Sequence, residues 1–129
     1  MITFRKRVLS KEEDLMPEAI EFLQKTDGKP FKIITPSEAD EVSRVNSKAM
    51  VLVSFIKNSQ GFYQIQIQDK ELYNYTQKLL KDIFRMRITN IDREHRTITA
   101  ECDHYGIALA ILDVIREKYD LSVVYSKKK

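Results

Sequence analysis

The chain has 129 residues, of which 43% are apolar and 32% are charged, as is ordinary for one globular domain with its own core. No apolar run approaches the roughly 20 residues of a membrane-spanning helix, and the basic N-terminus lacks the apolar segment of a secretory signal. The single cysteine, Cys102, leaves no intrachain disulfide. These features predict one domain over 1–129 that is intracellular, cytoplasmic and without a membrane contact.

The formal net charge of +3 is concentrated at one end of the chain. Residues 1–48 hold nine Lys or Arg and nine Asp or Glu, whereas residues 49–129 hold thirteen and ten. This excess equals the three lysines at 127–129, which we expect to be a solvated tail. The net charge therefore does not indicate a basic fold.

The N-terminal segment is predicted to be mainly helical. Residues 2–8 are expected to form a short edge strand. Ser10 and Glu13 then make a capping box, and an amphipathic helix follows with acidic residues at its positive end. Pro17 falls in the first turn or two of this helix, where its missing N–H costs little. The turn at 27–30 ends the segment.

The next segment contains one ambiguity. Residues 31–34 form a strand, and 35–38 (Thr-Pro-Ser-Glu) open a helix with a cap, a first-position proline and a glutamate that reaches back. The run 50–56 could continue that helix. It is, however, β-branched and aromatic, and the turn-forming residues 58–61 follow it. We favour a strand, paired as a hairpin with 62–68.

The C-terminal half alternates strands and helices. The predicted elements are a strand over 62–68, a helix opened by Asp69, a strand with Met86 and Ile88 inward, a turn at 93–95, a strand over 97–102, a helix over Asp103–Tyr119 capped by Asp103, and a last strand with Leu121, Val123 and Tyr125 inward.

The helix over Asp103–Tyr119 is expected to be the centre of the core. Apolar residues recur in it at steps of three and four and fill most of its other faces. A helix apolar over so much of its circumference must be covered on more than one side. The residues left for water are Asp113, Arg116, Glu117 and Lys118.

Three helix caps are evenly spaced, and each begins a strand–helix–strand unit. Thr35, Asp69 and Asp103 are separated by 34 residues twice. The side chains barely match from unit to unit, so the repeat is one of element order alone. The domain then divides into an N-terminal segment (1–30), three β-α-β units (31–56, 62–91 and 97–126, together 31–126) and a basic tail (127–129).

The predicted fold class is α+β, with a mixed, mostly antiparallel sheet and about four helices. Residues 62–126 have the order β-α-β-β-α-β, which is ferredoxin-like and places the first strand in the centre of the sheet. A hairpin between 50–57 and 62–68 would occupy one side of that strand. The simple ferredoxin-like sheet would then have to rearrange.

Alternation predicts the register of the hairpin over 86–102. Placing Ile88 opposite Ala100 puts Arg87 opposite Glu101 and Thr89 opposite Thr99. A polar sheet face follows, with Val124 as its one apolar member. Its other members are Gln64, Gln66, Gln68, Arg85, Arg87, Thr89, Thr97, Thr99, Glu101, Ser122 and Ser126.

We expect no metal, no cofactor and no catalytic residue. Cys102 and His104 are two residues apart, but one cysteine and one histidine cannot close a structural zinc site, and His95 lies roughly 23 Å back along a strand. The alternation buries the Cys102 thiol, which argues against a nucleophile. Three glycines provide no phosphate-binding loop.

The segment Asp103-His104-Tyr105-Gly106 is the most distinctive one. A glycine early in a helix that leaves a strand lets a ligand or another backbone approach closely. The order strand, Asp-x-x-Gly, helix resembles the opening of ACT regulatory domains, although here it follows the third strand and not the first. That resemblance implies an amino-acid site at a subunit interface. We favour the alternative, close helix–strand packing at Gly106.

These patterns predict a non-catalytic protein-interaction or oligomerising domain. It would act through the polar sheet face or through exposed apolar residues such as Phe55 and Val124. One alternative is a weak nucleic-acid binder using the arginines and the lysine tail, although the face lacks stacking aromatics. Another is a small-ligand-binding regulatory domain. The candidate binding residues are Arg85, Arg87, Arg93, Arg96, Gln64, Gln66, Asp103, His104 and Gly106.

Overall fold

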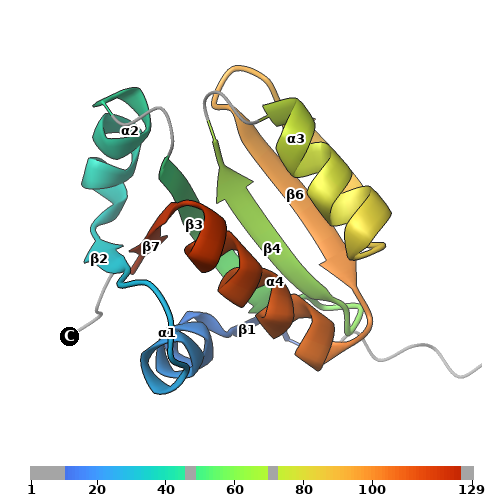
Figure 1. The fold of residues 1–129 in the computed structure, drawn as a ribbon. Helices are drawn as coiled ribbons and strands as arrows, with labels where there is room; N and C mark the ends of the chain where they lie inside the picture. Colours follow the sequence, from blue (N-terminus) through green and yellow to red (C-terminus); the bar gives the residue numbers. More distant parts are fainter. Residues whose placement is uncertain (1–10, 46–48, 70–72, 126–129) are drawn as a thin grey trace, which may run out of the picture.

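The computed structural model describes residues 11–45, 49–69 and 73–125. Over these ranges the chain has the predicted α+β class, with one mixed seven-stranded sheet and four α-helices (Figure 1). No helix in the described ranges is both long and apolar enough to cross a membrane. The predicted strand over 2–8, the cap Ser10, Ser126 and the lysine tail lie outside the described residues.

The sheet has the strand order β2-β7-β3-β4-β6-β5, and β1 pairs with the far end of β3. The pairs β2–β7 and β7–β3 are parallel, and the others are antiparallel. The strands are β1 (Glu13–Asp14), β2 (Lys32–Ile34), β3 (Ala49–Lys57), β4 (Tyr63–Gln68), β5 (Arg87–Asp92), β6 (Thr97–Cys102) and β7 (Asp120–Val124).

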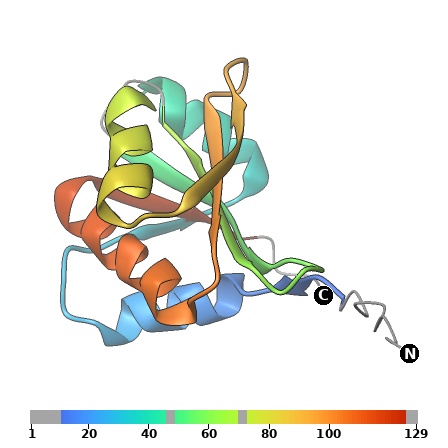
Figure 2. The ribbon, with the colours of Figure 1, turned by 90° about the vertical axis from the view of Figure 1, so that its right-hand side faces the viewer.

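Helices lie on both faces of the sheet, as Figure 2 shows. One face carries α1 (Met16–Lys25), α4 (Tyr105–Lys118) and α3 (Tyr73–Lys78), which continues as the π-helical turn η1 (Leu79–Ile83). The other face is covered only in part, by α2 (Pro36–Val45) above β2, β7 and β3. Helix α2 therefore covers one end of the polar sheet face.

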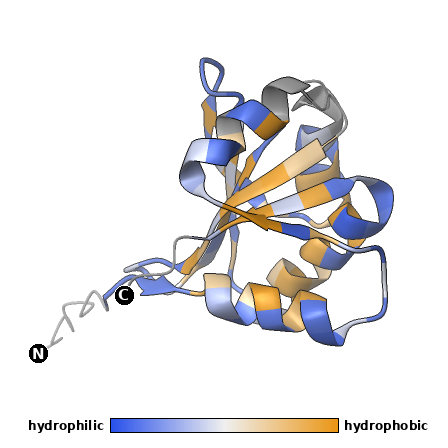
Figure 3. Ribbon diagram, turned by 90° about the vertical axis from the view of Figure 1, so that its left-hand side faces the viewer, coloured by the Kyte–Doolittle hydropathy of each residue, from blue (hydrophilic) through white to orange (hydrophobic). Residues whose placement is uncertain are grey.

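Two apolar clusters correspond to these two layers. The larger one joins α1, α4 and η1 to inward side chains such as Met50, Ile65 and Ile98. The smaller one lies under α2 and contains Ile34, Ala39, Val51 and Val124. Figure 3 shows the apolar strands between the helices and the hydrophilic β5–β6 turn.

The ambiguous segment is a strand, as we predicted. β3 pairs with β4 as a hairpin, with Phe55 opposite Ile65. Phe55 and Val124 are 0% and 8% exposed, so the expectation that they form an exposed contact surface is wrong. Phe55 belongs to the larger apolar cluster, and Val124 belongs to the smaller one under α2.

The hairpin rearranges the ferredoxin-like sheet. β4 lies between β3 and β6, and β6 pairs with β5, as that order requires. β7 pairs with β3 and not with β4. The sequence order β-α-β-β-α-β is present, but β3 is inserted between its first and last strands.

The N-terminal helix begins later than predicted. Glu13 and Asp14 form β1 beside β3, and the Leu15 N–H donates to the Phe55 carbonyl at 2.8 Å. Asp14 Oδ1 accepts from the N–H of Met16, the first residue of α1, at 3.0 Å. Pro17 lies in the first turn, as expected. Strand pairing with β3 thus takes residues that the capping pattern assigned to the helix.

The predicted capping residues are confirmed in part at α2 and wrong at α4. At α2 the Glu38 carboxylate accepts from the Thr35 N–H at 3.1 Å and from the Thr35 hydroxyl at 2.8 Å, so the predicted glutamate that reaches back is confirmed. At α4 the cap is His104 and not Asp103, because His104 Nδ1 accepts from the Ile107 N–H at 3.3 Å. The helix opened by Asp69 starts, within the described residues, at Tyr73.

The β5–β6 register is confirmed in part. Ile88 is opposite Ala100, and Arg87 is opposite Glu101. The predicted pair Thr89–Thr99 is wrong, because a bulge after Ile88 places Asn90 opposite Thr99. The displaced Thr89 hydroxyl donates to the Thr99 carbonyl at 3.4 Å. Alternation alone cannot locate a bulge, since it adds one residue to one strand.

Candidate binding groove

A groove of about 240 Å³ lies on the polar sheet face. One wall is the first turn of α2, the other is the β5–β6 turn, and the floor is built from β3, β4, β6 and β7. The groove lies near the carboxyl ends of the parallel strands β2 and β7, where the sheet changes from parallel to antiparallel pairing, a common place for ligand sites. Its described lining residues are Pro36, Ala39, Val53, Gln66, Gln68, Asp92, His95, Thr97 and Val124.

The groove has an apolar half and a polar half. Ala39 and Pro36 of α2 face Val53 and Val124 on the sheet, and these residues continue the small core under α2. The polar half comes from strand alternation, which places the glutamines of β4 and Thr97 of β6 on the face opposite the main core. An amphipathic group could therefore contact both halves at once.

The β5–β6 turn is fixed by Asp92. Its Oδ1 accepts from the backbone N–H groups of Glu94 and His95, each at 3.1 Å, and its Oδ2 lies 2.8 Å from His95 Nδ1. The hydrogen bond from the His95 side chain, followed by the backbone hydrogen bond from the same residue, lowers the pKa of Asp92 below its ordinary value. Asp92 is thus held as a carboxylate at neutral pH.

The turn is also tied to the floor of the groove. The His95 carbonyl accepts from Gln68 Nε2 and from Thr97 Oγ1, both at 3.1 Å. The polar wall is therefore built before any ligand binds. Pre-formed geometry of this kind lowers the entropy cost of binding.

The polar half offers hydrogen-bonding groups but, among the described lining residues, no lysine or arginine. Asp92 is the one carboxylate among these described residues. The Gln66 side chain, half-buried in the floor, forms no hydrogen bond with another described residue. Its amide presents one acceptor and two donors to the groove.

The predicted arginines do not gather at this groove. Arg87 pairs with the buried Glu101, which also accepts from Asn58 Nδ2 at 3.1 Å, so Arg87 is already partnered. We predicted that Arg85 lies on a strand of the polar face, but it precedes that strand, β5. Arg85 and Arg96 are at opposite ends of β5, roughly 20 Å apart by the rise per residue of a strand. The four arginines therefore do not make one patch.

Arg85 and Arg96 nevertheless share an unusual backbone conformation. Their φ angles are +53° and +54°, in the left-handed region that favours glycine. Both side chains are exposed, and neither forms a hydrogen bond or ion pair with another described residue.

The side chains around His104 make structural contacts. The His104 imidazole caps α4, and the half-buried Cys102 thiol donates to the His104 carbonyl at 3.3 Å. Desolvation raises the pKa of this thiol, the opposite of what a nucleophile needs. Within the described residues, no three His, Cys, Asp or Glu side chains gather as metal ligands would.

The favoured interpretation of Gly106 is wrong. A methyl group placed on Gly106 would contact the His104 imidazole, the nearest atom at 3.1 Å, and no strand backbone within 4 Å. Gly106 and Asp103 are exposed. The glycine therefore does not mark a close approach of α4 to the sheet.

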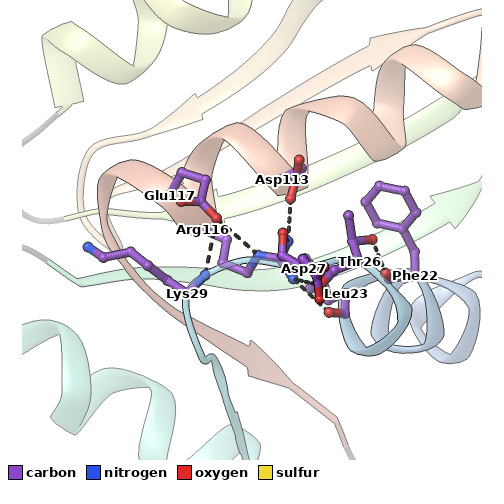
Figure 4. A network of polar contacts seen from close by, with 8 residues as sticks. All are labelled: Phe22, Leu23, Thr26, Asp27, Lys29, Asp113, Arg116 and Glu117. Atoms are coloured by element: carbon purple, nitrogen blue, oxygen red, sulfur yellow. Dashed lines mark hydrogen bonds and ion pairs between the residues drawn. The ribbon is translucent and has the colours of Figure 1, made fainter.

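Arg116 is a structural residue that the sequence pattern did not indicate. It is 1% exposed, although we expected it to face water. Its Nη1 donates to the carbonyls of Leu23 (2.6 Å) and Thr26 (3.2 Å), and its Nη2 donates to that of Asp27 (3.2 Å) (Figure 4). Arg116 also pairs with Asp113. Its spacing of four residues from the buried Leu112 was the available signal.

Comparison with protein-family models, with curated proteins and with solved structures finds no match. The function is accordingly argued from the groove itself.

Proposed function

We propose that this chain is a non-catalytic protein-interaction domain that binds an extended segment of a partner protein in the groove between α2 and the β5–β6 turn. The observation that carries the proposal is the Gln66 amide, unpartnered among the described residues, between an apolar strip and the fixed Asp92–His95 turn. A peptide backbone provides the donors and acceptors that such an amide needs, and alternate side chains can contact the apolar strip.

The size and composition of the groove support a peptide over a cofactor. Cofactor and drug-sized ligand sites are commonly ~300–1,000 Å³ and mostly apolar. This groove is smaller, at about 240 Å³, and five of its nine described lining residues have polar side chains. It would accommodate a side chain and part of a backbone from a longer segment that continues over the sheet face.

The proposal is tested by selecting peptides from a random 12-residue display library on the full chain. Peptides that bind are then measured against two variants on the same strand and face. Gln66→Phe fills the groove, whereas Gln64→Phe lies two residues away and is not among the described lining residues. We expect binding to weaken more than about tenfold in Gln66→Phe, by loss of the contacts at the site, and to be unchanged in Gln64→Phe.

Two results would overturn this proposal. One is a failure of the library to yield any binding peptide. The other is equal binding to the wild-type chain and to Gln66→Phe, with the fold of both checked by circular dichroism.

Weak nucleic-acid binding stays a second candidate because Arg85 and Arg96 are exposed and unpartnered among the described residues. It predicts fluorescence anisotropy changes with single-stranded oligonucleotides that fall steeply with salt. In the double variant Arg85→Gln/Arg96→Gln the affinity and its salt dependence should both decrease. No binding at low salt would remove this candidate.

A further inference from the structure

We infer that the partner segment presents a basic side chain, arginine or lysine, to this groove. The inference rests on the proposed function and adds the chemistry that the groove selects. It concerns the described lining residues, their charge and the order in which apolar and polar groups follow one another along the groove.

The charge of the described lining residues disfavours an anionic ligand. Asp92 is a carboxylate on one wall, and no lysine or arginine among the described lining residues compensates it. The positive end of α2 is already engaged, because the Glu38 carboxylate accepts from the Thr35 N–H. A phosphate or carboxylate would meet Asp92 with no lysine or arginine beside it, only the His95 imidazole that already contacts Asp92 Oδ2 at 2.8 Å, whereas a guanidinium or ammonium group would be attracted.

The apolar half of the groove can contact the methylene groups of an arginine or lysine side chain. Arginine and lysine bury their methylene stems along apolar surface and keep the charged head in a polar environment. Val53, Val124 and Ala39 provide that surface on the α2 side. From there the head would reach the Asp92 carboxylate, and the Gln66 amide oxygen would accept a second hydrogen bond.

Asp92 has acceptor capacity left for this contact. A carboxylate offers about four lone-pair sites. Three are used by the two backbone N–H groups and the His95 imidazole. The remaining site would accept one N–H from the incoming cation, in an orientation that the turn already fixes.

The test uses three capped tripeptides, acetyl-Ala-Xaa-Ala-amide, with arginine, citrulline or norleucine in the centre. Citrulline keeps the shape of arginine but has no charge, and norleucine keeps only the apolar stem. Binding to the full chain is followed by ¹⁵N chemical shifts of the Gln66 and Gln68 side-chain amides and of the Thr97 N–H. We expect the arginine peptide to bind about fivefold more tightly than the citrulline peptide, as for a partly exposed ion pair.

Two variants locate the selectivity. Asp92→Asn removes the charge but keeps acceptor capacity for the turn, and should bring the arginine and citrulline affinities together. Glu94→Gln removes an exposed carboxylate of the same turn that is not among the described lining residues, and should leave the ratio unchanged. If Asp92→Asn disturbs the turn, the comparison of peptides on the wild-type chain still decides the question.

The outcomes separate this inference from the proposed function. Equal binding of arginine and citrulline, with library peptides still sensitive to Gln66→Phe, would overturn the inference and leave a charge-indifferent peptide groove. Selectivity that survives Asp92→Asn would place the cation elsewhere and also overturn it. If no peptide of either kind binds, both fail.

Discussion

Arg116 shows how one side chain can hold two distant elements together. It lies on the buried side of α4 and donates to three carbonyls at the end of α1 and just beyond it, where the helix leaves its last C=O groups without internal partners. The cation is also favourable at the negative end of the α1 dipole. Its Nε is the one buried side-chain nitrogen or oxygen, among the described residues, that has no hydrogen-bond partner.

Replacing Arg116 should therefore destabilise the fold strongly. In Arg116→Met the carbonyls of Leu23, Thr26 and Asp27 lose their donors, and we expect a loss of about 2–4 kcal/mol in the free energy of unfolding. Urea denaturation followed by circular dichroism measures this change. The matched control is Lys118→Met, an exposed cation in the same helix, which should change stability by no more than ~0.5 kcal/mol. A loss equal to that of the control would show that water replaces the guanidinium.

The left-handed backbone at Arg96 gives a prediction of opposite sign. An L-residue with a side chain is destabilised in this region by roughly 1 kcal/mol, and glycine is not. Arg96→Gly should raise the free energy of unfolding by ~0.5–1 kcal/mol, measured by the same denaturation experiment. Arg93→Gly, in the same turn but without a positive φ, should be neutral or destabilising. An unstable Arg96→Gly would mean that the arginine side chain contributes more than the strain costs.

The residues that sequence reasoning placed correctly are those governed by simple alternation. Gln64, Gln66 and Glu101 were assigned to the polar face because strand side chains alternate, and β4 and β6 keep that register. Arg116 was missed because a charged residue on a helix is normally solvated, and only a tertiary contact with α1 makes its burial favourable. The Asp92–His95 turn was located, but its approach to α2 depends on the sheet topology.

At the scale of elements, the two outer strands of the described sheet are both protected against pairing with a second copy. β2 has three residues and is flanked by Pro30 and Pro36, which cannot donate to a ladder. β5 carries the bulge after Ile88 and the charged Arg87 and Asp92 at its ends. These features disfavour self-association through the edges of β2 and β5.

The connection between α1 and β2 makes a prediction about glycine. A methyl group on Gly28 would overlap Arg116 Nη2 and Glu117 Oε1, and both side chains are held by contacts with this loop. Gly28→Ala should therefore destabilise the chain by about 1–3 kcal/mol, measured as a lower urea midpoint.

Gly106→Ala is the matched control for this substitution. Its methyl group would meet only the exposed His104 imidazole that caps α4, which must shift by a few tenths of an ångström, and this small cost is offset because alanine is the better helix former, by up to roughly 1 kcal/mol in a helix interior. We expect an unchanged or higher midpoint. A loss at Gly106 as large as that at Gly28 would restore the interpretation that α4 needs a glycine at its start.

At the scale of the whole molecule, the three β-α-β units are interlocked and do not stack as separate modules. β7, from the last unit, lies between β2 and β3, which both belong to the first unit. The sequence indicates the order of elements because periodicity and caps are local. It does not indicate that β7 pairs with β3 and not with β4. That pairing depends on whether β3 is already paired with the edge of β4, and both topologies are compatible with the same local pattern.

This interlocking predicts that the ferredoxin-like half cannot fold alone. A fragment of residues 62–126 keeps β4, β5 and β6 but removes both neighbours of β7, and it leaves unpaired the edge of β4 that pairs with β3. We expect no cooperative urea transition and poor dispersion in its ¹⁵N NMR spectrum, whereas the full chain and a chain shortened by residues 127–129 should both unfold cooperatively. A stable, cooperative fragment would show that β7 can move beside β4. In that case the inserted strand β3, and with it the Val53 side of the groove, would be an addition to a self-sufficient ferredoxin-like fold.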